Sequence, residues 1–292
     1  MNSPHASRIT HHASRFWLPL AAAAVLLLAA PPVPAGIPMP MFVIYGTIRD
    51  TYGWPIQSGA GAIVVAQQGT NECARYVIQN PLYPGVNYML PIYLQDSNAG
   101  ANYSAKAVLP GSLVQLSVIQ NGVTQSLMPA STTCLVGSPA QAVNMTLTLG
   151  TDVDGDGLPD GWEQELIAYL DDPRYRTIWD IRPNEDADGD GVSNLNEFLA
   201  GTFAFLRDDF LRIENYGTSA SLFGLGFLTV PGKAYSVAQS TNLGAGTWSY
   251  PPYAQTTNGV LQTGPFSGSG DWMQVYVPRT NGFGALRLQV SP

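Results

Sequence analysis

Histidine is almost absent from this chain of 292 residues: its three copies, His5, His11 and His12, all lie within the first twelve positions. The rest of the chain therefore offers no serine–histidine or cysteine–histidine pair, no histidine zinc ligand and no histidine general base. Catalysis would have to rest on carboxylate, lysine, tyrosine or metal chemistry.

Long hydrophobic runs are also scarce, and the one present lies near the start. Two arginines precede an apolar run at 16–30, and small residues at 33 and 35 follow it. The run is shorter than the roughly 20 residues of a spanning helix, so the pattern predicts a signal peptide over 1–35, with an uncleaved anchor as the alternative. We expect a secreted mature chain with no membrane span, extracellular or at the cell surface.

Cysteine is limited to Cys73 and Cys134. An exported chain meets an oxidising compartment, which favours a single disulfide between them; two buried free thiols are the alternative.

Basic residues are few and scattered, so no basic patch indicates a nucleic-acid partner. Acidic residues are concentrated, because 17 of the 21 lie between 152 and 214. The four outside this segment are Asp50, Glu72, Asp96 and Asp271. They are too dispersed to predict a carboxylate enzyme, which needs two acids in one cleft, and Asp50 fits a turn better than a catalytic role. We therefore do not expect an enzyme.

The acidic segment contains two copies of one twelve-residue pattern, at 152–163 and 186–197. Both fit a calcium loop, in which positions 1, 3, 5, 7, 9 and 12 supply oxygen ligands and glycine at position 6 allows a sharp turn. The first copy offers Asp152, Asp154, Asp156, the Leu158 carbonyl, Asp160 and Glu163. The second offers Asp186, Asp188, Asp190, the Val192 carbonyl, Asn194 and Glu197. A solvated acidic linker is the alternative, but it does not explain the ordered spacing. The sequence thus predicts two bound Ca²⁺ ions.

Helical spacing of apolar residues follows each loop, and neither loop is clearly preceded by a helix. Gly201 is expected to end the second helix. This loop-plus-helix unit resembles dockerins, the calcium repeats of bacterial exported proteins and, more distantly, thrombospondin type 3 repeats. Dockerins usually carry small hydroxyl or charged recognition residues at loop positions 10 and 11, where this chain has Gly161-Trp162 and Leu195-Asn196.

Residues 36–151 alternate short β-branched and aromatic runs with turn residues. Strands are predicted at 41–48, 62–67, 74–78, 103–108, 113–119 and 143–149, with a hairpin signal at 121–122. Such spacing favours a β-sandwich. The run from Gly46 to Ile56, followed by Ser58-Gly59-Ala60, resembles the opening of carboxypeptidase-regulatory-like domains, which implies a small exported spacer domain.

Residues 207–292 return to a strand pattern, at 211–216, 222–230, 234–239, 272–277 and 285–290, and predict a second β-sandwich. The stretch from Pro231 to Leu243 and Trp248 is similar to C-terminal sandwich modules that accompany such calcium repeats. The expected fold class is therefore mainly β, with two sandwiches joined by a small helical calcium segment at 152–206.

Two functions follow from this organisation. In the first, calcium folds and stiffens the joint of a structural or adhesive surface protein. In the second, the chain is a carbohydrate-binding or dockerin-like module whose partner is a polysaccharide or another surface protein. Trp248, Tyr250, Tyr253 and Trp272 could then form a stacking platform for sugar rings.

Overall fold

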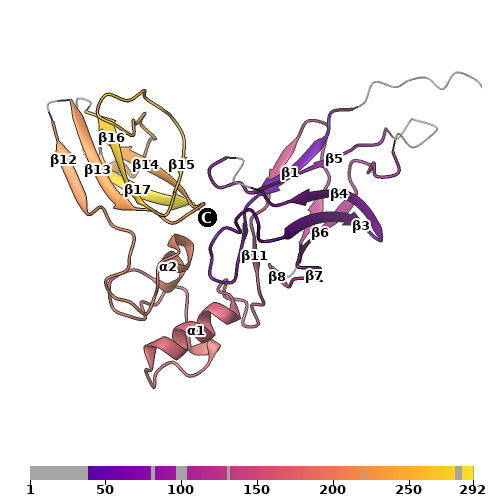
Figure 1. Cartoon of the computed structure of the whole chain (residues 1–292), viewed down its shortest axis with the longest axis horizontal. Coiled ribbons are helices and arrows are strands. Elements are labelled where there is room, and N and C mark those ends of the chain that lie inside the picture. Colours follow the sequence, from indigo (N-terminus) through magenta and orange to yellow (C-terminus); the bar gives the residue numbers. More distant parts are fainter. Residues whose placement is uncertain are drawn as a thin grey trace, which may run out of the picture. The chain divides into compact units, whose positions relative to one another are not determined.

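Strands are the predominant regular structure of the described chain and lie on either side of a short helical stretch, as Figure 1 shows. The structure is a computed structural model and describes residues 39–79, 83–96, 104–129, 132–219, 221–279 and 285–291. The expected fold class, mainly β with a small helical segment, is confirmed. The expected signal peptide at 1–35 lies outside the described residues. Within them, no helix is both long and apolar enough to cross a membrane.

The strands before the first acidic loop pair in the orders β10-β1-β5, β2-β11-β8 and β4-β3-β6-β7, with β9 also on β6. Their pattern of burial explains why they form: in β6, Val114, Leu116 and Val118 are buried while the residues between them are more exposed, the period of two expected of a strand. The bounds are β1 (Phe42–Gly46), β2 (Ile48–Arg49), β3 (Ala62–Gln68), β4 (Asn71–Val77), β5 (Tyr88–Ile92), β6 (Leu113–Gln120), β7 (Val123–Thr124), β8 (Leu127–Met128), β9 (Thr133–Leu135), β10 (Ala142–Asn144) and β11 (Leu147–Leu149).

Three differences from the predicted strands have causes that the structure shows. The strand predicted at 103–108 is wrong for its described part: Ser104 accepts the N–H of Ala107 in a turn, and only Val108 pairs, as an isolated bridge. The strand β5 is not among the predicted strands; it contains Pro91 and lies at the edge of its sheet, where a missing N–H is tolerated. The segment predicted as one strand at 143–149 is two, since β10 pairs with β1 and β11 with β2.

The strands of the C-terminal part form the orders β12-β13-β16 and β15-β14-β17. Buried side chains of both orders, among them Phe227, Tyr235 and Val275, share one core. The strand predicted at 211–216 begins only at Asn215, because Leu211 and Ile213 pack on that core without belonging to a ladder. The bounds are β12 (Asn215–Thr218), β13 (Leu222–Leu228), β14 (Ala234–Ser240), β15 (Phe266–Ser267), β16 (Trp272–Pro278) and β17 (Ala285–Ser291), with a 3-10 turn η2 (Leu243–Ala245).

The predicted helices are confirmed as α1 (Asp160–Leu170) and α2 (Asn194–Ala200), with a 3-10 turn η1 (Ile178–Asp180) between them. The helix α2 ends at Gly201, whose left-handed conformation closes it as expected. Trp162 and Leu166 of α1 pack with Phe198 of α2 in a small separate core. The described residues thus contain one core in each predicted domain, while the predicted boundaries at 151 and 206 stay predictions.

The disulfide expected between Cys73 and Cys134 is wrong, because both are buried free thiols. Cys73 lies in β4 and Cys134 in β9, and β3 and β6 stand between these strands. The two cysteines are thus three strand spacings apart, about 14 Å measured perpendicular to the strands. A disulfide needs Cα atoms within about 7 Å.

A buried lysine links the three segments. The ammonium group of Lys233, which precedes β14, donates to the carbonyl of Gly53 at 2.5 Å and to that of Leu199, in α2, at 2.7 Å. Gly53 adopts φ +78°, and a Cβ there would lie 2.5 Å from the carbonyl oxygen of Phe198. Only glycine therefore fits this close approach without strain.

Candidate metal centre

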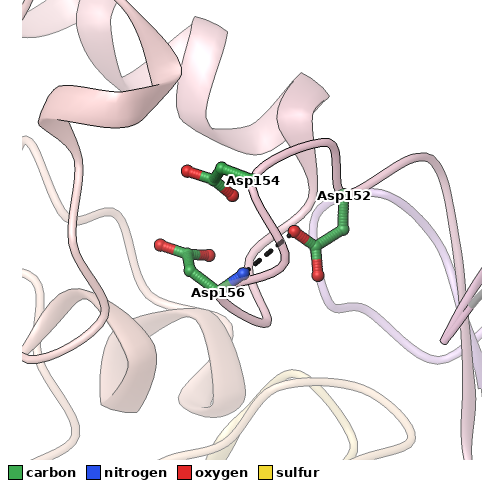
Figure 2. Close-up of side chains that lie close together, drawn as sticks. All are labelled: Asp152, Asp154 and Asp156. Atoms are coloured by element: carbon green, nitrogen blue, oxygen red, sulfur yellow. Dashed lines mark hydrogen bonds between the residues drawn. The ribbon is translucent and has the colours of Figure 1, made fainter.

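Each predicted loop closes around the aspartate at its first position. Asp152 accepts hydrogen bonds from the backbone N–H groups of loop positions 4, 5 and 6 at 2.7, 3.1 and 3.2 Å. Asp186 accepts the same three bonds in the second loop, at 2.7, 3.2 and 2.8 Å. Figure 2 shows the bond from Asp156 to Asp152. The two copies in the sequence are therefore two copies of one backbone structure.

The glycine at position 6 makes this turn possible. Gly157 and Gly191 both adopt φ +98°, a conformation that residues with a side chain rarely adopt. The turn brings the carboxylates of positions 1, 3 and 5 together. In each loop these three side chains offer oxygen atoms within 4.8 Å of one another. Figure 2 shows this group for the first loop.

The glutamates at position 12 lie in the first turn of each helix, and the groups within 4.8 Å comprise the three aspartates of each loop without them. Each glutamate is nevertheless close enough to the aspartates of its own loop to interact with them electrostatically. Glu163 and Glu197 are fully buried, and none of their four carboxylate oxygens has a hydrogen-bond partner. One buried oxygen each of Asp154, Asp188 and Asp190 is also without a partner. Burying such oxygens unpaired is costly, and native proteins rarely do so. An all-oxygen set suits a hard divalent cation such as Ca²⁺, so the residues present fit the ion that the sequence predicts.

The electrostatics of the metal-free loops agree with that fit. Burial, reinforced by the neighbouring aspartates, raises the pKa of Glu163 to about 9 and that of Glu197 to about 8. Burial and the nearby Asp190 likewise raise the pKa of Asp188 to about 6. Without a cation these carboxyl groups hold protons at pH values where an exposed carboxyl group is ionised.

The residues at position 9 have a role that sequence reasoning did not identify. Asp160 accepts the hydroxyl of Thr151 at 2.6 Å and the N–H of Val153 at 2.8 Å, so both of its oxygens are engaged. Asn194 similarly accepts the N–H of Ala187 at 3.2 Å. Position 9 thus ties the start of each loop to the start of the following helix. A ligand at this position commonly reaches calcium through a water molecule, which this arrangement permits.

Position 7 is predicted to coordinate through its carbonyl group. The N–H groups of Leu158 and Val192 donate to the position 5 aspartates at 2.9 and 2.7 Å, which fixes the backbone there. The Leu158 side chain is fully buried in the core beside α1 and anchors the first loop to it.

The alternative binding surfaces receive little support. Trp162, at position 11 of the first loop, is buried against Phe198, so it is not presented to a cohesin-like partner. Within the expected sugar platform, Tyr253 is 3% exposed and belongs to the core. The guanidinium of Arg287 covers the ring of Trp248 at 4.1 Å. Tyr250 and Trp272 remain exposed.

The predicted turn role of Asp50 is confirmed. One of its carboxylate oxygens accepts the N–H groups of Tyr52 and Trp54, both at 2.9 Å.

Comparisons with known proteins do not place this chain in a family. No protein-family model and no curated protein matches it. Among solved structures, a DUF3823 family protein from Parabacteroides merdae is similar at 8% identity, over 86% of this chain and 90% of that one, with a TM-score of 0.21. Likeness at this level carries no argument. None of these comparisons identifies an enzyme family.

Proposed function

We propose that this chain is a secreted calcium-binding modular protein, with a structural or adhesive role at the cell surface. Two Ca²⁺ ions would fold and stiffen segment 152–206, which joins two β-rich parts. Each ion would be held by the aspartates at positions 1, 3 and 5, the carbonyl at position 7 and the glutamate at position 12. The ion would neutralise charge that the loops otherwise hold as repelling or protonated carboxylates.

The observation that carries the proposal is the pair of buried glutamates. Glu163 and Glu197 enter from separate helices, yet both leave two buried oxygens without partners. An acidic linker would expose such groups to water. Because both helices also supply core residues, occupancy of each loop would stabilise the packing of α1 on α2.

The proposal is tested by calorimetric titration of the purified protein with calcium after chelation, with circular dichroism and melting recorded on the same samples. Extracellular calcium modules bind at about 0.1–1 mM. At about 10 mM calcium, each site should then stabilise the fold by about 1.4–2.7 kcal/mol. We expect two binding events and a higher melting temperature.

Matched variants assign the two sites. Glu163→Gln and Glu197→Gln keep side-chain shape and remove one charge, so each should abolish or greatly weaken one binding event. Asp208→Asn removes a charge from an exposed position outside both loops and should leave both events intact. Absence of binding up to about 10 mM calcium, well above that affinity range, would reduce both loops to an acidic linker.

A further inference from the structure

A cavity of about 220 Å³ opens beside α1, at a place that the calcium loops do not use. Its walls come from the turn at 50–54, from one face of α1 and from residues 202–205. Glu165 lines it, whereas Glu163 belongs to the first calcium loop. Residues two positions apart on an α-helix differ by about 200° in direction, so these two glutamates lie on opposite faces of α1. The cavity and the metal site are therefore distinct.

The charge that lines the cavity is of one sign. All lining residues belong to the described part of the chain, and the charged ones among them are Asp50 and Glu165. The turn fixes Asp50 through two backbone N–H bonds, and the Tyr52 side chain is hydrogen-bonded to Glu165. Burial raises the pKa of Asp50. A cation in the cavity would favour its ionised form.

Lys233 is close enough to Asp50 for its charge to lower the pKa of that carboxyl group, but the effect of burial is larger. Its ammonium group is bound by the carbonyls of Gly53 and Leu199, and Lys233 is not among the lining residues. Among the described residues, the ion pairs within 4.0 Å include neither Asp50 nor Glu165. The two carboxylates are thus available to a ligand.

The apolar walls are aromatic and partly open to solvent. Tyr52, Trp54 and Phe203 are 49%, 39% and 47% exposed, although large aromatic side chains are usually well buried. Aromatic faces attract organic cations, most strongly where water is excluded.

We propose that this cavity binds an organic cation, namely a primary ammonium or guanidinium group on a short apolar stem. The carboxylates of Asp50 and Glu165 receive the charged group, and the rings of Tyr52, Trp54 and Phe203 cover the stem. The volume is below the roughly 300 Å³ at which pockets for drug-sized ligands begin, so it suits a small amine or one side chain rather than an extended molecule. A neutral sugar would gain from the rings but would leave both carboxylates without a countercharge.

The test is a titration of the calcium-loaded protein with agmatine and with n-butylammonium, followed by tryptophan fluorescence and calorimetry. Trp54 and Trp162 both line the cavity and report on it directly. The neutral comparisons are n-butanol, which has the same four-carbon stem as n-butylammonium, and methyl glucoside. Both cations should bind saturably. The natural ligand could be a lysine side chain of a partner protein or a free amine, and N-acetyl-lysine N-methylamide distinguishes the two. Tighter binding of this compound than of n-butylammonium indicates a lysine side chain, and weaker binding indicates a free amine.

Charge variants tie the binding to this cavity. Glu165→Gln should weaken both cations about tenfold, because it removes one of two opposing charges. Asp50→Asn keeps a side-chain oxygen that can accept the N–H groups of Tyr52 and Trp54, and it should also weaken the binding of both cations. Glu185→Gln, at an exposed position outside the cavity, is the control and should change nothing. Should the charge variants misfold, Phe203→Leu retains the apolar wall and should still weaken binding about threefold through loss of the aromatic face.

Three results would overturn the proposal: no binding of either cation, equal binding of a neutral comparison, or cation affinity unaffected by Glu165→Gln in a folded variant. Calcium titration of the same samples keeps this test separate from that of the proposed function. If the loops bind calcium normally and the cation does not bind, only the cavity assignment fails.

Discussion

Calcium binding should release about two protons from each chain at pH 7. In the metal-free fold, Glu163 has a pKa of about 9 and Glu197 one of about 8. At pH 7 these values correspond to about 0.99 and 0.9 bound protons. A carboxyl group must lose its proton to coordinate a metal ion. Asp188, with a pKa of about 6, adds only about 0.1.

The assay is calorimetry at pH 7 in several buffers that differ in ionisation enthalpy. The observed binding enthalpy plotted against buffer ionisation enthalpy has a slope equal to the number of protons released. Between pH 6 and 8, the affinity of the first loop should rise about tenfold per pH unit, since one proton is displaced. Glu163→Gln should remove about one proton from the slope, whereas Asp208→Asn should leave it at about two.

The stability of the metal-free protein provides an independent check of the direction of the glutamate pKa shifts. A glutamate whose pKa is raised by folding holds a proton in the fold that the unfolded chain has already released. The free energy of unfolding of the metal-free protein should therefore fall as the pH rises from about 4.5 to about 9. Two calcium ions bound with a proton slope near zero would refute the reasoning, because the glutamates would then be ionised before the ions arrive.

Three further outcomes follow from other parts of the fold. Burial lowers the pKa of Lys233 to about 7, so between about pH 7 and 10 the unfolded chain holds a proton that the folded protein has lost. The free energy of unfolding of the calcium-loaded protein, measured by urea denaturation, should therefore rise over this pH range, and Lys233→Met should abolish that rise. Gly53→Ala should destabilise by at least about 2 kcal/mol in the same assay, whereas Gly59→Ala, also at positive φ but in open space, should cost about 1 kcal/mol. Cys73 and Cys134 should both react with a thiol reagent in denaturant without prior reduction, and a reductant should not change the melting temperature.

The loops were predictable because their structure is local. Backbone N–H groups within a few positions bind the first aspartate, and glycine at position 6 supplies the required φ, so spacing alone predicts the turn. The helices were predictable for the same reason, since a run of apolar residues at helical spacing packs against its own neighbours.

Features that depend on distant parts of the chain were not predictable. The cysteines stand three strands apart, a separation that appears only once the sheet order is known. The strand β5 contains Pro91, and nothing local shows that its edge position tolerates the proline. The cavity beside α1 combines residues from 50–54, 162–166 and 202–205. The turn role of Asp50 is predictable from its neighbours in the sequence, but no sequence pattern indicates that Glu165 lines the same cavity.

The hydrogen bonds of Lys233 affect how the chain would bear mechanical force. The covalent path from the N-terminal β-rich part to the C-terminal one runs through both acidic loops, but the lysine joins Gly53 to β14 directly. Around it, Gly232 lies against Pro55 and Gln57, and Ala234 lies against Gly85. Tension applied to the two ends of the described chain would load this group of contacts first, and the acidic loops would carry force only after these contacts had broken.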